Sequence, residues 1–214
     1  MAERESTSRA SAARAIPARS LAWSALAVVL CFGAVFAWHV DARAIDWQPA
    51  LASREPWRAL SAAFVHYSGL HLAANLAGAL LVGALGHAAG VPLRSTGAWL
   101  AAWPLTQFGL LLQPTLLHYG GLSGVLHAGV AVVCVHLLMA GSRVQRRIGA
   151  ALFAGLVVKL LSEAPWQGAL HHPSGWDIAV APFAHVSGVV MGTLAALVAQ
   201  AWHRLGQRAP RSRP

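Results

Sequence analysis

The chain has 214 residues, of which 57% are hydrophobic and only 11% are charged, whereas an average soluble domain carries about 25% charged residues. This composition excludes an ordinary water-soluble globular domain. The formal net charge of +9 would suit a nucleic-acid partner only if the cations clustered on one face. They lie between apolar runs, so no nucleic-acid partner is expected. The two cysteines, Cys31 and Cys134, are too few for a disulfide framework or a four-cysteine metal site.

The apolar runs predict an all-α membrane protein. A helix needs about 20 mostly apolar residues to cross a bilayer, and six stretches come close to that length: 20–39, 69–86, 96–113, 121–140, 148–162 and 182–202. We therefore expect one six-helix domain over residues 20–202, with disordered basic tails at 1–19 and 203–214. The first run could also belong to a cleaved signal peptide, with Ala42-Arg43-Ala44 as a weak cleavage site. Its length favours a retained span.

The positive charges test this topology independently of hydropathy. Lys and Arg accumulate on the cytoplasmic side of membrane proteins. Twelve of the 16 fall on one side of the predicted bundle: Arg4, Arg9, Arg14, Arg19, Arg94, Arg143, Arg146, Arg147, Arg204, Arg208, Arg211 and Arg213. This distribution predicts that both termini are cytoplasmic and that the second, fourth and sixth helices begin at the outer face.

Polar residues stand at the start of each of these three helices, although polar side chains are costly in lipid and often mark function. The second helix begins with His71 and Asn75, which four-residue spacing places on one face. The fourth and sixth helices carry two further groups: Gly121, Ser123, Gly124 and His127, then His185, Gly188 and Gly192. All three groups are expected at one depth below the outer surface. The small residues allow two helices to approach closely.

This combination of residue types favours nucleophilic catalysis. A serine hydroxyl needs a base to accept its proton, and histidine suits that task near neutral pH, so Ser123 and His185 form a candidate pair. His71, Asn75 and the Ser123 N–H could stabilise an oxyanion. No Asp or Glu is expected within reach at that depth, which predicts a dyad. No H-E-x-x-H motif or intramembrane aspartate pair occurs, and neither a metal nor a cofactor is expected.

Each group taken alone has a simpler interpretation. A serine near a helix end usually caps it, and a lone intramembrane histidine more often joins two helices. A small transporter would also carry polar groups, but along a path through the membrane. Because the three polar groups are expected at one depth, catalysis is favoured over these structural roles and over a transporter. His171 and His172 in the last outer loop are interpreted as solvated.

Five segments between residues 56 and 195 together resemble the rhomboid family of six-helix intramembrane serine proteases. They are Trp57-Arg58, His66, His71-x-x-x-Asn75, Gly121-Leu-Ser123-Gly124 and Ala184-His185-x-x-Gly188-x-x-x-Gly192. The resemblance implies that Ser123 is the nucleophile and His185 the general base and acid. It also implies that His71 and Asn75 are oxyanion partners and that His66 is structural.

Two positions depart from the family pattern. His127 stands where many rhomboids have a tyrosine that stacks on the catalytic histidine, and His87 stands where many have a glutamate. The sequence Leu-Ser-Gly-Val-Leu-His at residues 122–127 resembles the rhombosortase branch. That branch implies membrane-anchored substrates with a C-terminal Gly-Gly signal, an apolar helix and a basic tail.

The resemblance therefore implies a multi-pass enzyme of a bacterial inner membrane, in contact with lipid, whose site faces the periplasm. The substrate is expected to enter laterally past the short helix predicted at 148–162, which would act as a gate. Hydrolysis and transfer to an amine acceptor both remain open. The alternative is a catalytically inactive rhomboid-like protein that binds membrane helices.

Overall fold

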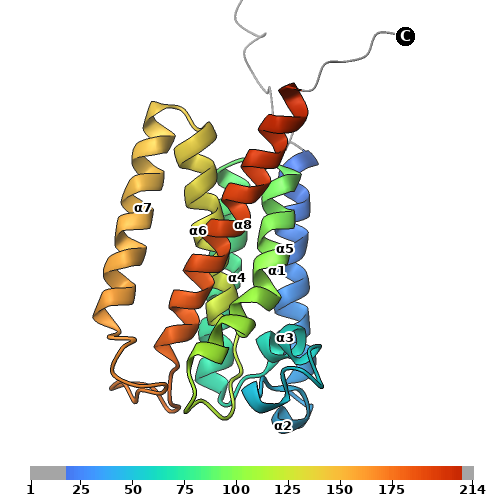
Figure 1. Cartoon of the computed structure of the whole chain (residues 1–214), viewed down its shortest axis with the longest axis vertical. Helices are drawn as coiled ribbons and strands as arrows, with labels where there is room; N and C mark the ends of the chain where they lie inside the picture. The colour runs from blue at the N-terminus through green and yellow to red at the C-terminus, as the bar shows by residue number, and fades with distance from the viewer. Residues whose placement is uncertain (1–17, 209–214) are drawn as a thin grey trace, which may run out of the picture.

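The computed structural model describes residues 18–208, which form six long helices and two helices of a single turn (Figure 1). The long helices are α1 (Ala18–Ala37), α4 (Gly69–Ala88), α5 (Leu93–Gly109), α6 (Ser123–Ala140), α7 (Arg143–Ser162) and α8 (Pro182–Arg208). The short helices α2 (Ala42–Ile45) and α3 (Arg58–Ser61) lie in the connection from α1 to α4. Most of the two predicted tails, residues 1–17 and 209–214, falls outside the described residues. The helix α8 continues to Arg208, beyond the end predicted for the last helix at residue 202.

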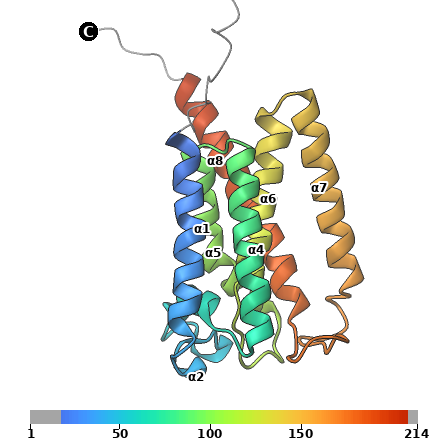
Figure 2. The ribbon, with the colours of Figure 1, turned by 180° about the vertical axis from the view of Figure 1, so that it is seen from behind.

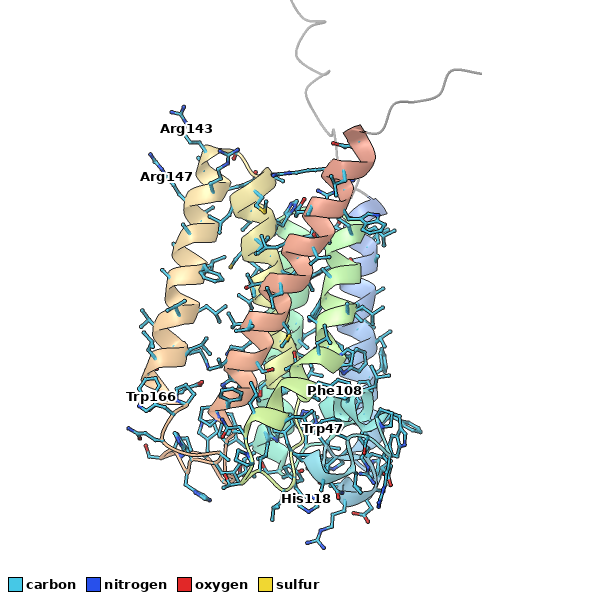
Figure 3. All side chains as sticks on the ribbon, in the orientation of Figure 1. Trp47, Phe108, His118, Arg143, Arg147 and Trp166 are labelled. Atoms are coloured by element: carbon cyan, nitrogen blue, oxygen red, sulfur yellow. The ribbon has the colours of Figure 1, made fainter. Side chains whose placement is uncertain are left out.

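The long helices alternate in direction along the bundle (Figures 1 and 2). The helices α4, α6 and α8 begin at the lower end of Figure 1, where α2 and α3 also lie. Figure 3 shows the same alternation in α7, with Arg143 and Arg147 at the upper end and Trp166 just beyond the lower end. The three helix starts that carry the predicted polar groups therefore share one end of the molecule.

The chain is a multi-pass membrane protein by the length and composition of its helices. Among the described residues, α1, α4, α6 and α8 are long and apolar enough to cross a membrane. The helix α5 has 17 residues with Pro104 inside it, and α7 carries Arg143, Arg146 and Arg147 near its start. For α5 and α7 the membrane span stays a prediction.

The helix α7 is longer than the sequence predicts. Its start was expected at residue 148, but it begins at Arg143. The cause is a capping box: Ser142 Oγ accepts the Gln145 N–H, and Gln145 Oε1 accepts the Ser142 N–H. With 20 residues, α7 is as long as α1 and α4, so a short length no longer marks it as a gate.

The helix α6 occupies the centre of the bundle, where it contacts α4, α5, α7 and α8. Its closest neighbour is α8, and glycines make this approach possible. A Cβ added to Gly188 would lie 2.0 Å from the Gly124 carbonyl oxygen, and one added to Gly192 would lie 2.4 Å from the Ala128 carbonyl oxygen. Only glycine fits at residues 188 and 192, so the backbone of α8 lies directly against the backbone of α6. By contrast, α7 lies at the edge and packs mainly on α6 (Figures 1 and 2).

The connection from α1 to α4 supports the segment that leads into α6. Trp47 and Tyr119 exchange two backbone hydrogen bonds of 2.8 and 2.9 Å. The Trp47 side chain is fully buried and packs edge-on against Phe108. Arg58 is buried too, and its guanidinium donates to Glu55 and to the carbonyl oxygen of Asp46. These contacts hold residues 116–122 in place, and Ser123 follows directly.

Candidate active site

The structure brings Ser123 and His185 into hydrogen-bond contact. Ser123 is the first residue of α6 and His185 lies in the first turn of α8. The Ser123 Oγ lies 3.0 Å from the His185 Nε2, within the range for a nucleophile and its base. This contact depends on the close packing of α6 on α8, because each residue lies within a turn of the Gly124–Gly188 contact.

A tight turn at Gly121 precedes Ser123 and fixes the position at which α6 begins. Gly121 has a φ of 140°, a backbone conformation that side chains rarely adopt, and its N–H donates to the Ala62 carbonyl oxygen at 2.9 Å. A Cβ at this position would also lie 2.8 Å from the His71 Nε2. Glycine is therefore required on two grounds, and the turn lies directly against His71.

His71 and Asn75 lie in the first two turns of α4 and are both buried. They line a cavity of about 820 Å³ together with Ser123, His127 and His185. The Asn75 side-chain amide donates to the His71 carbonyl oxygen at 3.1 Å. The structure therefore gathers all four predicted catalytic and oxyanion residues around one cavity.

His127 occupies the position at which the family pattern has an aromatic residue, and it stacks on His185. The ring centroids are 4.2 Å apart and the planes differ by 14°. The His127 Nδ1 lies 2.7 Å from the Ser123 carbonyl oxygen, and because a carbonyl only accepts, Nδ1 carries the proton. A second imidazole thus supplies the stacked ring.

A carboxylate also reaches His185, contrary to expectation. The Glu163 Oε2 lies 2.6 Å from the His185 Nδ1, and the Glu163 Oε1 contacts the Lys159 Nζ. Burial raises the pKa of Glu163, but the hydrogen bonds and charges of His185 and Lys159 outweigh it and lower the pKa to about 2. The prediction that no Asp or Glu is within reach is therefore wrong.

Sequence reasoning missed Glu163 because the residue follows α7 at the start of a long loop, where a charge is ordinarily solvated. The signal that could have found it is topological. An antiparallel pair of helices places the end of the first beside the start of the second, so Glu163 at the end of α7 faces the first turn of α8.

His66 lies just outside the cavity and behaves as a buried structural residue. Its Nδ1 lies 3.0 Å from the Phe64 carbonyl oxygen, and its ring centroid lies 4.8 Å from that of His71. Burial lowers the pKa of His66 to about 4, which keeps its ring neutral. The structural role that the resemblance implies for His66 stays a prediction.

Polar residues that the sequence did not single out lie at the rim of the cavity, where Tyr67, His118 and Tyr119 line it, and directly behind this rim. Asp46 is buried and accepts hydrogen bonds from the Tyr67 hydroxyl at 3.2 Å and from the His118 Nδ1 at 2.8 Å. Burial also raises the pKa of Tyr119 to about 12. His171 and His172 line the cavity, so their interpretation as simply solvated loop residues is incomplete.

One further observation concerns the site, and two comparisons with known proteins concern the identity of the chain. Within residues 18–208, no group of three or more His, Cys, Asp or Glu is placed to hold a metal ion. A comparison with curated proteins finds no match. A comparison with protein families matches the Rhomboid domain over residues 53–202, which is well over half of the chain and contains the cavity described above. The chain therefore belongs to the rhomboid family.

Proposed function

We propose that the protein is an intramembrane serine protease that cleaves the transmembrane segments of other proteins. The observation that carries the proposal is the 3.0 Å hydrogen bond between Ser123 and His185 inside a cavity at one end of a helical membrane bundle. Most rhomboid family members are serine peptidases, and the family generally acts on transmembrane substrates.

The proposed reaction begins when the Ser123 Oγ attacks a peptide carbonyl carbon and passes its proton to the His185 Nε2. The carbonyl electron pair moves to the oxygen and gives a tetrahedral oxyanion. When the C–N bond breaks, the leaving amine takes the proton from Nε2 and an acyl-enzyme on Ser123 remains. Water then attacks the ester with His185 as the base, which restores the free hydroxyl.

The oxyanion is proposed to lie between the start of α6 and the first turns of α4. The first N–H groups of a helix have no partner within it, so the Ser123 N–H is available to an oxyanion. His71 and Asn75 line the same cavity from α4. Each hydrogen-bond donor to an oxyanion typically raises the reaction rate by about 10²–10³. We therefore expect His71 and Asn75 each to increase kcat.

The finer assignment is to rhombosortase-type processing of a C-terminal Gly-Gly signal. It is supported by residues 122–127, Leu-Ser-Gly-Val-Leu-His, which resemble that branch. The distribution of Lys and Arg supports a site facing the periplasm of a bacterial inner membrane. An amine acceptor in place of water would transfer the acyl group and leave the same residues in the same roles.

The test is the release of the ectodomain from a co-expressed membrane substrate that carries a C-terminal Gly-Gly signal, an apolar helix and a basic tail. Wild type, Ser123→Ala and His185→Ala are compared by the mass of the released product. Release by wild type alone supports the protease, and a mass greater than that of the cleaved chain indicates transfer. Release by Ser123→Ala would refute the mechanism. Co-purification of uncleaved substrate with the wild type would favour the binding-protein alternative.

A further inference from the structure

We infer that Glu163 is a positioning residue that completes a Ser123–His185–Glu163 triad in this protein. The inference rests on the proposed function, because it assigns a role in the same reaction. It replaces the dyad that the sequence predicts.

The hydrogen bonds fix which nitrogen of His185 carries the proton. Glu163 is ionised and can only accept, so the Nδ1 at 2.6 Å from its Oε2 is the donor. In the neutral ring, Nε2 is then a bare acceptor, and it lies 3.0 Å from the Ser123 Oγ. This is the tautomer required to take the serine proton. The same carboxylate faces the positive charge that His185 gains during the reaction.

Glu163 is itself held in place by the end of α7. Its two oxygens have separate partners, since Oε1 contacts Lys159 one turn earlier and Oε2 contacts His185. The chain then turns sharply at Ala164, whose φ of 47° ends the helix. The Glu163 side chain is 24% exposed and lines the cavity, so solvent reaches it.

His185 is constrained from the other sides as well. The ring of His127 stacks on it from α6, and His71 faces the same cavity from α4. The titratable or charged groups around His185 are therefore Ser123, His127, His71, Glu163 and Lys159. Glu163 is the anion among them, and it accepts the hydrogen bond from Nδ1 while Ser123 occupies Nε2.

The reaction balances without any proton transfer to Glu163. The proton leaves the Ser123 Oγ, resides on the His185 Nε2, and passes to the leaving amine. The Nδ1 proton stays on the ring throughout. Glu163 therefore acts through His185 and does not touch the substrate.

The variants Glu163→Gln, Glu163→Ala and Lys159→Met test this role. Two rates are measured in detergent: labelling of Ser123 by a fluorophosphonate, and cleavage of the Gly-Gly substrate as kcat and KM. The equivalent change at the buried aspartate of a soluble serine protease costs about 10⁴ in kcat. Because Glu163 is partly exposed, we expect a loss of about 10² in kcat and in the labelling rate, with KM within about twofold of wild type.

The decisive readout is chemical rescue. Formate is small enough to replace the missing carboxylate, so it should raise the labelling rate of Glu163→Ala several-fold and leave Ser123→Ala unlabelled. Lys159→Met removes the ion pair to the other carboxylate oxygen but keeps the carboxylate that contacts His185, so it should lose less activity than Glu163→Gln and should not respond to formate. Asp177→Asn serves as a matched outer-loop control, since Asp177 accepts a hydrogen bond from Ser68 and not from His185.

Three results would overturn the triad. They are wild-type kcat in both Glu163 variants, an equal loss in Lys159→Met and Glu163→Gln, or no rescue of Glu163→Ala by formate. Thermal unfolding of each variant in detergent identifies any that lose activity through misfolding, and Glu163→Gln keeps the side-chain shape if Glu163→Ala does not fold. Failure of the wild type to label or to cleave would overturn the proposed function, and the triad with it.

Discussion

The contact between Gly188 and Gly124 gives a quantitative prediction about the distance between the catalytic helices. In Gly188→Ala, the new Cβ would lie 2.0 Å from the Gly124 carbonyl oxygen. An unstrained carbon–oxygen contact is about 3.3 Å, so α8 must move away from α6 by more than about 1 Å. The Ser123–His185 distance of 3.0 Å would then exceed hydrogen-bond range.

The expected cost of this displacement is large for activity and moderate for stability. A misplacement of about 1 Å in an active site lowers the rate by about 10², and overpacking lowers the free energy of unfolding by about 1–3 kcal/mol. The assay is kcat for the Gly-Gly substrate in detergent, together with the thermal midpoint. Gly206→Ala is the matched control, because it lies in the same helix with nothing within 4 Å of the added Cβ. Wild-type kcat in Gly188→Ala would refute the reasoning.

Substitutions at three other positions give distinct outcomes. His127→Ala loses both the stacked ring and the 2.7 Å bond to Ser123, whereas His127→Phe loses only the bond. We expect a loss in kcat/KM of about fivefold for the phenylalanine, equivalent to about 1 kcal/mol, and a larger loss for the alanine; equal losses would contradict a role for stacking. The pKa of His66 falls from 6.5 to about 4 on burial, so below pH 6.5 the unfolded chain binds a proton that the folded chain does not. Acidification through this window should therefore cost about 2 kcal/mol by pH 5, and His66→Gln should shrink the drop in thermal midpoint between pH 7 and pH 5. Ala164 has a φ of 47°, so Ala164→Gly should leave the midpoint unchanged or raise it slightly, while Ala164→Val should lower it; the reverse order would exclude strain at this turn.

The helices and the grouping of the four catalytic and oxyanion candidates could be predicted from the sequence, because both depend on local patterns. Apolar runs located the six long helices to within a few residues at most ends. Because successive helices alternate in direction, the starts of α4, α6 and α8 had to lie at the same end of the bundle. For this reason the sequence alone groups Ser123 and His185 with His71 and Asn75, and the structure gathers all four around one cavity.

The errors arise where tertiary contacts decide the outcome. The start of α7 depends on a reciprocal pair of side-chain hydrogen bonds at Ser142 and Gln145, which outweighs the charge of the following arginines. Glu163 reaches His185 because the end of α7 folds back toward α8, and no local pattern contains that contact. In the same way, the hydrogen bonds of Asp46 with Tyr67 and His118 join three separate segments beside the cavity.

The position of α7 at the edge of the bundle has a consequence for the timing of catalysis. Glu163 reaches the site only from the end of this peripheral helix, whereas Ser123 and His185 belong to the tightly packed pair α6 and α8. Any outward displacement of α7 that admits a substrate also withdraws the carboxylate from His185. The Ser123–His185 contact joins α6 to α8 and does not involve α7, so such a displacement would break the Glu163–His185 contact alone. In the proposed mechanism, an outward position of α7 and an intact Glu163–His185 contact therefore exclude each other.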